Sequence, residues 1–366
     1  MIRKIALIGY FVFAGWLLPL CASAQFTETK EINKQFKVSP ETQIEISNKY
    51  GKIEINTWEK DTVVFDIKIR VEEKKLSKLE ESIEGIDFDI TDSEHYLIVR
   101  TDVGKNKSSL GREITRFKET MLNTGSNIQI DYTVWMPVGN ELNVENKFGD
   151  IYIDDYSGDV KINLSNGNLK AHDFDSELDL TLNFADVSIN SINRGRLECN
   201  FSELYIKKAE SLRIKSKSTD FEILEIKDLN AGSRRDKFRI RLAETVDAQS
   251  SFSSFRLNEL TNELTLRSEY GDIDIEKTPP DFSNIVIESK STDINLYFAE
   301  ESKFDFEITH TKSELDFCPE VEIAEEEILD EKMKKIKLTG NFGEKAENKT
   351  RLHINASSGE INIFSD

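Results

Sequence analysis

Apolar and polar residues alternate in two short runs joined by a small-residue bend, and this phrase recurs nine times between residues 142 and 296. The first copy, residues 142–153, is LNVENKFGDIYI. We take the residue just after each bend as an anchor. The anchors are Asp150, Asn168, Asp186, Glu203, Asp220, Lys237, Ser254, Asp272 and Asp293, at steps of 18, 18, 17, 17, 17, 17, 18 and 21 residues. Alternation with a period of two predicts half-buried β-strands rather than helices.

A repeat of about 17 residues cannot bury its own apolar face, so neighbouring copies must stack. The copies either form antiparallel hairpins or form coils whose equivalent strands pair in parallel. A two-residue hairpin turn needs positive φ, hence Gly or Asn, yet Gly precedes the anchor in only three of nine copies (Gly149, Gly167 and Gly271). The pattern therefore predicts an all-β, parallel β-solenoid with about 17–18 residues per coil. We expect it to be right-handed, as parallel crossovers usually are.

When the copies are aligned on their anchors, equivalent positions form columns. Two of these columns carry residues other than aliphatic ones. Four positions before the anchor, serine occupies five consecutive copies: Ser216, Ser233, Ser250, Ser268 and Ser289. These serines either fit a tight corner or form an internal hydroxyl ladder. Two positions before the anchor, aromatic residues recur at Phe148, Phe184, Phe201, Phe252 and Tyr270. Stacking between coils is their expected role, and an exposed carbohydrate-binding stripe is the alternative.

The first 24 residues have the pattern of a cleavable signal peptide. Arg3 and Lys4 precede an apolar run over residues 5–20, and residues 22–24 are Ala-Ser-Ala, a small-x-small cleavage site. A lipoprotein anchor at Cys21 is the alternative, disfavoured because Leu20 precedes it. No later run of 18 or more apolar residues exists, so no transmembrane segment is expected. The chain is therefore predicted to be exported, to the periplasm or outer surface of a Gram-negative bacterium.

The remaining chain divides into three parts. Residues 25–140 should hold a first coil, at 44–55, and a β-rich capping insertion with a short helix. Residues 141–300 supply the regular coils, and residues 301–366 supply irregular coils that end in a closing repeat at 352–363. The expected elements are an edge strand at 26–38, further strands at 63–71, 86–90, 96–103, 128–135, 304–308 and 334–338, a helix at 74–83, and a helical turn at 114–121. We expect the acidic run at 319–331 to be a solvent-exposed excursion from the stack. A calcium site is the alternative.

The charge balance limits the partners. The formal net charge is −20, and removal of Arg3 and Lys4 with the signal peptide lowers it by two, to −22. So acidic a surface repels nucleic acid, which we exclude as a partner, and also repels anionic lipid. Cys199 and Cys318 remain after cleavage. Cys199 falls in an inward column, so we expect a small buried residue, with a disulfide to Cys318 as the alternative.

No stretch of the sequence identifies a reaction or a cofactor. The four histidines lie far apart, and no nucleophile elbow, phosphate loop or zinc cysteine pair is present. The metal candidates are the acidic anchors Asp150, Asp186, Glu203 and Asp220. Ordinary turn chemistry explains such carboxylates; calcium binding and glycosidase-like acid/base work are the alternatives. The binding candidates are Arg234, Arg235, Arg239 and Arg256, which with Lys237 and Arg241 gather on adjacent coils. They either pair with carboxylates or meet an anionic glycan or partner.

The chain contains the phrases NKYGKIEI, which Trp58 follows, ENKFGDIYI and RSEYGDIDI. These three phrases resemble those of the bacterial extracytoplasmic proteins known as "putative adhesins". The sequence as a whole is also similar to the sequences of Bacteroidetes envelope proteins. The resemblance covers roughly residues 40–366 and implies a β-solenoid domain of unknown function in the cell envelope. It implies no catalytic residues. We therefore expect a non-catalytic, adhesin-like binding or scaffolding module for a glycan or an envelope protein. The alternatives are a polysaccharide-acting enzyme of the parallel β-helix type and a purely structural envelope protein.

Overall fold

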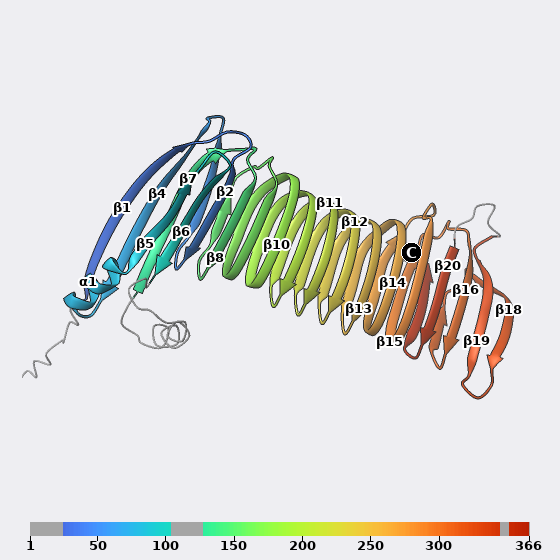
Figure 1. Ribbon diagram of the computed structural model, residues 1–366. Coiled ribbons are helices and arrows are strands. Elements are labelled where there is room, and N and C mark those ends of the chain that lie inside the picture. Colours follow the sequence, from blue (N-terminus) through green and yellow to red (C-terminus); the bar gives the residue numbers. More distant parts are fainter. Residues whose placement is uncertain (1–24, 104–126, 345–350, 366) are drawn as a thin grey trace, which may run out of the picture.

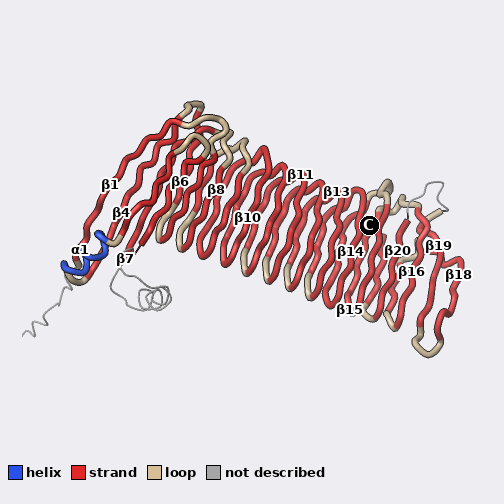
Figure 2. Tube along the Cα trace, viewed as in Figure 1, coloured by secondary structure: helices blue, strands red, loops and turns tan. Residues whose placement is uncertain are grey.

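The computed structural model describes residues 25–103, 127–344 and 351–365. These residues form one elongated stack of strands, with a single short helix at the N-terminal end (Figure 1). Coloured by secondary structure, the stack is almost wholly strand, with brief loops along its two edges (Figure 2). The helical turn expected at 114–121 lies outside the described residues.

The regular coils pair in parallel, as the alternation predicted. Their strands are β8 (Leu142–Lys147), β9 (Ile151–Ile153), β10 (Val160–Asn200), β11 (Glu203–Lys217), β12 (Asp220–Arg234), β13 (Lys237–Ser251), β14 (Ser254–Thr278) and β15 (Asn284–Phe298). The anchors align in register, with Asp186 opposite Glu203, Glu203 opposite Asp220, and Asp220 opposite Lys237. Each coil is therefore one repeat of the sequence, and the hairpin alternative is wrong.

The core is the set of apolar columns stacked along the axis. Inward residues of successive coils, such as Ile206, Ile223 and Ile240, are fully buried. One column is aromatic: the rings of Phe221, Phe238 and Phe255 stack with centroids 4.6 Å apart at each step. That distance is close to the roughly 4.8 Å spacing of paired strands, so identical side chains meet face to face from coil to coil.

The N-terminal part forms one end of the stack. Its elements are β1 (Phe26–Lys37), β2 (Gln43–Lys49), β3 (Ile53–Trp58), β4 (Thr62–Glu73), α1 (Leu76–Glu84), β5 (Ile86–Asp92), β6 (Tyr96–Val103) and β7 (Asn127–Pro137). The first coil, β2 and β3, pairs in parallel with β8 and β9, although about 85 residues of sequence separate them. Beyond it, β7, β4 and β1 pair antiparallel and end the sheet.

The C-terminal part departs from the expected order. Its strands are β16 (Phe304–Thr311), β17 (Glu314–Phe317), β18 (Val321–Asp330), β19 (Lys335–Phe342), β20 (Arg351–Ser357) and β21 (Glu360–Ser365). The last repeat does not close the array: β20 lies between β15 and β16 and pairs in parallel with both. The phrase carries the same apolar columns as its neighbours, so Leu352 aligns with both Ile285 and Phe306.

The end of the stack is formed by β16, β19 and β18, which pair antiparallel (Figure 1). The acidic run at 319–331 is therefore mostly strand rather than an excursion, although almost every side chain of β18 is exposed. The disulfide alternative is also wrong: Cys199 and Cys318 are both free thiols, and burial raises the pKa of Cys199 above its usual range.

Candidate functional site

In each regular coil, the bend just before the anchor contains one residue with a left-handed backbone, two positions before the anchor. We call this row the bend edge: Tyr50, Phe148, Asn166, Phe184, Phe201, Ser218, Arg235, Phe252, Tyr270 and Ser291, with φ between 49° and 66°. The scarcity of Gly one position before the anchor counted against positive φ at these bends, and this was wrong: the left-handed residue stands one position earlier and is not a glycine. Gly149 is instead required by close approach, because a Cβ there would lie 1.9 Å from the Gly51 carbonyl oxygen of the neighbouring coil.

The aromatic residues of the bend edge form stacked pairs. Ring centroids lie 6.0 Å apart in Tyr50–Phe148 and 5.0 Å apart in both Phe184–Phe201 and Phe252–Tyr270. The last four side chains are also exposed: Phe184 by 59%, Phe201 by 47%, Phe252 by 53% and Tyr270 by 42%. The expected inter-coil stacking is confirmed. The same rings also form the exposed stripe that was its alternative.

A lysine from the next coil lies over the outer ring of two of these pairs. Lys217 Nζ is 5.8 Å from the Phe201 ring centroid, and Lys290 Nζ is 5.7 Å from that of Tyr270. An exposed cation over an aromatic face contributes about 0.5–1 kcal/mol. Each pair therefore has one ring face covered by a cation, and its ring edges remain in solvent.

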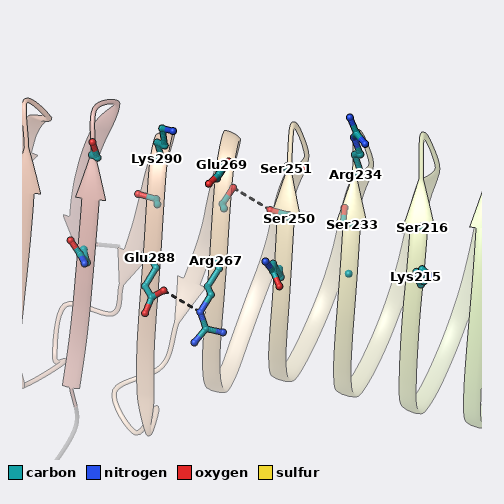
Figure 3. Close-up of a pocket in the computed structure, with 16 residues that line it drawn as sticks. Lys215, Ser216, Ser233, Arg234, Ser250, Ser251, Arg267, Glu269, Glu288 and Lys290 are labelled. Carbon is teal, nitrogen blue, oxygen red and sulfur yellow. Dashed lines mark hydrogen bonds and ion pairs between the residues drawn. The ribbon is translucent and has the colours of Figure 1, made fainter.

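Beside the bend edge, the outer face of the strands before the bends is hollowed over about 840 Å³. Figure 3 shows this hollow running across successive coils, with Lys215, Arg234, Arg267 and Lys290 along it. Small residues of the intervening coils, Gly232 and Ser251, form part of its lining. Arg267 is neutralised by Glu288, with Nε 3.1 Å from Oε2. No described residue forms an ion pair with Lys215 or Arg234. With Arg267 paired to Glu288, the remaining charged residues of the lining are Lys215, Arg234, Lys290 and the single acid Glu269, so the hollow is locally basic on an acidic protein.

A buried hydrogen-bond network fixes the bends beneath this surface. Asp236 is 1% exposed, and its Oδ2 accepts hydrogen bonds from the hydroxyls of Ser216 (2.7 Å) and Ser233 (2.8 Å) and from the backbone N–H of Arg234 (2.9 Å). Its Oδ1 accepts the backbone N–H of Thr219 at 2.8 Å. In the next coils, Ser250 donates to Ser268 at 3.2 Å. The hydroxyl ladder considered from the sequence therefore exists only in part: Ser250 and Ser268 bond directly, Ser216 and Ser233 are joined through the buried carboxylate, and the Ser289 hydroxyl has no partner among the described residues.

The four candidate arginines do not form one patch, because the bend divides them. Arg234 lies in the hollow, on the strand before the bend, and Arg235 is the left-handed residue of the bend itself. Arg239 and Arg256 face each other on the strands after the bend. Both lie near carboxylates of adjacent coils: Arg239 is 3.9 Å from Asp220 and Arg256 is 3.3 Å from Asp274. Pairing with carboxylates is therefore confirmed for these two.

The acidic anchors form a row on the other side of the bend edge. Asp186, Glu203 and Asp220 lie on successive coils, and Asp150 lies two coils earlier. Asp150 Oδ1 accepts hydrogen bonds from Asn168, from its backbone N–H at 2.9 Å and from Nδ2 at 2.8 Å. Asp220 lies 3.8 Å from Lys237. Within the described residues, no three His, Cys, Asp or Glu side chains are arranged to hold a metal ion; calcium binding stays a hypothesis.

Sequence reasoning missed the lysines that flank the aromatic pairs. Lys217 and Lys290 stand three positions before their anchors, and Lys215 stands five before. The residues three and five positions before the anchor vary from coil to coil, and only the folded structure shows that a lysine of one coil covers the ring of the previous coil. The sequence does carry one signal for these lysines. An aromatic residue two positions before the anchor of one repeat is matched by a lysine three positions before the anchor of the next repeat.

A family model described as Toastrack DUF4097 matches residues 41–364. Among solved structures, a "putative adhesin" from Parabacteroides distasonis is 11% identical, with a TM-score of 0.34, 74% of this chain covered and 93% of that one. A "putative lipid binding protein" from the same organism is 11% identical, with a TM-score of 0.35 and the same coverage. A "putative adhesin" from Bacteroides fragilis is 11% identical, with a TM-score of 0.25, covering 91% of this chain and 97% of that one. No curated protein matches the chain.

Proposed function

The chain belongs to the Toastrack DUF4097 family, and we propose that it is a non-catalytic binding module of the bacterial cell envelope that holds an acidic glycan along its bend edge. One observation carries the proposal: exposed, stacked aromatic pairs lie beside cations that form no ion pair with any described residue. Exposing large aromatic side chains has a cost in water, and contiguous exposed apolar surface marks interaction sites.

The chemistry of the edge suits a sugar polymer with negative charges. The exposed ring edges of the stacked pairs offer apolar contact to a sugar, and the Lys215 and Arg234 side chains in the hollow attract carboxylate or sulfate groups. The exposed carboxylates of Asp186, Glu203 and Asp272 follow the aromatic residues on the other side and can accept hydrogen bonds from hydroxyls. A sugar presents all three kinds of surface within one residue.

A lipid surface fits the same edge less well. A bilayer is broad, so it would meet the acidic anchor row together with the aromatic row, and the chain as a whole has a net charge of −20. Anionic headgroups would be repelled by both. A single polymer chain can instead follow the basic side of the bend edge. Location in the envelope rests on the predicted signal peptide at residues 1–24. Among the described residues, no helix is long and apolar enough to cross a membrane.

The test compares dextran sulfate with uncharged dextran, which shares its backbone. We expect the mature chain to bind dextran sulfate in isothermal titration, with an affinity that falls as salt is added, and to bind dextran far more weakly. The double variant Lys215→Ala, Arg234→Ala should lose at least about tenfold in affinity, equivalent to about 1.4 kcal/mol. The control, Lys161→Ala with Lys227→Ala, removes the same charge from exposed sites outside the hollow and should bind normally.

Equal binding of the two polymers, or equal loss in the two double variants, would overturn the proposal. The enzyme alternative is tested in the same samples. Polygalacturonate that is shortened by the wild type but not by Asp186→Asn or Asp220→Asn would show catalysis instead.

A further inference from the structure

We infer that the bend edge carries two equivalent subsites that bind one extended acidic polysaccharide at the same time; this rests on the function proposed above. The first subsite, triplet N, consists of Phe184, Phe201 and Lys217. The second, triplet C, consists of Phe252, Tyr270 and Lys290. In each triplet two stacked rings are followed, on the next coil, by the lysine that lies over the second ring.

The two triplets are related by a fixed translation along the stack. The strand pairings from Lys217 pass through Arg234, Ser251 and Glu269 to Lys290, which is four coil steps. Phe184 and Phe252 are likewise separated by four steps, counted along the anchors from Asp186 to Ser254. At about 4.8 Å per step, equivalent atoms of the two triplets lie roughly 19 Å apart.

The ring geometry gives both triplets the same orientation. The planes within a pair differ by 5° in triplet N and 10° in triplet C, and the 5.0 Å centroid distance matches one coil step. The rings therefore stand across the axis. The lysine covers the ring face toward the C-terminal end, and the opposite face is turned toward the preceding coil, which carries Asn166 before triplet N and Arg235 before triplet C. A polymer with a regular repeat can meet both triplets in one direction.

The surface between the triplets is suited to the same chain. Ser218 and Arg235 occupy the two bends that separate Phe201 from Phe252, so no aromatic ring blocks the path. Arg234 and Ser251 lie along the hollow at this level (Figure 3). Gly232 also lines it, and Gly232 and Ser251 present little bulk. A ligand that joins the two triplets would therefore pass over a basic, sparsely filled segment of the edge.

A third aromatic pair provides an internal contrast. Tyr50 and Phe148 stack at 6.0 Å on the same edge, but the residue of the next coil that corresponds to Lys217 is Ser165. A serine therefore stands here at the position that the lysine occupies in each triplet, and we expect Phe148→Ser to leave the dependence on ligand length unchanged.

Two linked subsites predict a dependence on ligand length. A short oligomer occupies one triplet, whereas a chain that spans roughly 19 Å engages both, and the second contact becomes intramolecular. The affinity should therefore rise in a step, by roughly 100-fold or more, when the oligomer becomes long enough to reach the second triplet.

The experiment uses oligogalacturonates of increasing length, from the disaccharide to the polymer, titrated into the mature chain and into variants. The variants are Phe201→Ser, Tyr270→Ser and their double, because serine already occupies the bend edge at Ser218 and Ser291. Phe148→Ser is the matched control. We expect each single variant to bind short oligomers but to lose the step, the double variant to lose binding, and the control to keep both.

The outcomes of this titration distinguish the two-subsite inference from the proposed function on which it rests. A smooth rise in affinity with length, or a step unaffected by Phe201→Ser, would overturn the two-subsite inference while leaving glycan binding intact. Failure of every length to bind would remove the proposed function itself. Binding to phosphatidylserine vesicles in place of polygalacturonate would overturn both, and would make the edge a membrane contact.

Discussion

Phe184 and Phe201 lie on successive coils with ring centroids 5.0 Å apart and planes 5° from parallel, although both are about half exposed and both have left-handed backbones. The fold needs the left-handed residue at each bend of this edge, but it does not need an aromatic one, since Asn166 and Ser218 occupy the same position. For residues other than glycine this conformation costs about 1–2 kcal/mol. Aromatic side chains at these bends are therefore better explained by binding of a ligand than by a contribution to the stability of the fold.

Replacement of a bend-edge aromatic residue should change stability little. Phe184→Asn removes a stacking contribution of about 0.5–1.5 kcal/mol. It also introduces a residue that adopts the left-handed conformation more easily. We expect the free energy of unfolding, measured by urea denaturation, to change by less than about 1 kcal/mol. A loss above about 3 kcal/mol would mean that the stacked pair is a structural element of the fold.

The buried carboxylate of Asp236 should matter far more. Asp236→Ala leaves the hydroxyls of Ser216 and Ser233 and the N–H groups of Thr219 and Arg234 without their acceptor. Each unsatisfied buried donor costs about 1–3 kcal/mol, partly recovered by rearrangement. We predict a loss of about 3 kcal/mol or more in the same denaturation assay. The exposed anchor variant Asp186→Ala is the control and should stay within about 0.5 kcal/mol. Equal losses of unfolding free energy in Asp236→Ala and Asp186→Ala would contradict the structural role assigned to the Asp236 carboxylate.

His310 should make stability depend on pH. It lies in β16, is 7% exposed, and its Nδ1 has no hydrogen-bond partner among the described residues. Burial lowers the pKa of its imidazole, against the smaller opposing influence of Glu326. The unfolded chain therefore takes up this proton more readily, starting near the ordinary pKa of about 6.5. Stability from the neutral imidazole is complete above that pH and is lost as the pH falls toward the lower folded-state pKa.

The measurement is the thermal midpoint between neutral and mildly acidic pH. The wild type should lose stability as the pH falls below about 6.5. The variant His310→Gln should show a smaller slope in that window, whereas His95→Gln, at an exposed site, should behave like the wild type. A slope unchanged in His310→Gln would assign the effect to other groups.

The exposed edge strand β18 should keep the stack from associating end to end. It pairs only with β19 among the described residues, and Ile323, Ile328 and Leu329 on it are exposed. Charged residues on such edges oppose pairing with another chain. The triple variant Glu325→Gln, Glu326→Gln, Glu327→Gln should therefore sediment as larger species than the wild type. The control Glu198→Gln, Glu210→Gln, Glu222→Gln changes exposed acids inside the stack and should not; identical sedimentation of both would refute the prediction.

The repeat columns were enough to predict parallel coils, their register and a first coil at 44–55, because each buried column repeats one apolar position. The C-terminal order was not predictable in this way. The phrase at 352–363 fits beside any coil, so its place between β15 and β16 is decided by three-dimensional packing rather than by its own pattern.

The candidate site was predicted in pieces. The aromatic row and Arg234 were both recognised, but the bend that separates Arg234 from Arg239 was not, because a linear cluster of arginines does not reveal which strand face each one occupies. The left-handed position was missed, since the scarcity of glycine counted against positive φ at these bends. The role of Asp236 is not visible in the sequence, because its four donors come from two successive coils that only the folded stack brings together.

The most direct test of the account is hydroxyl-radical footprinting of the mature chain with and without polygalacturonate. The account predicts that bound polymer protects Phe184, Phe201, Phe252 and Tyr270. Tyr96 and Tyr205, which are exposed elsewhere by 51% and 38%, should be oxidised at the same rate as before. Protection of Tyr96 or Tyr205 instead, or unchanged oxidation of all four bend-edge rings under conditions where the polymer is bound, would contradict the claim that the bend edge is the binding surface.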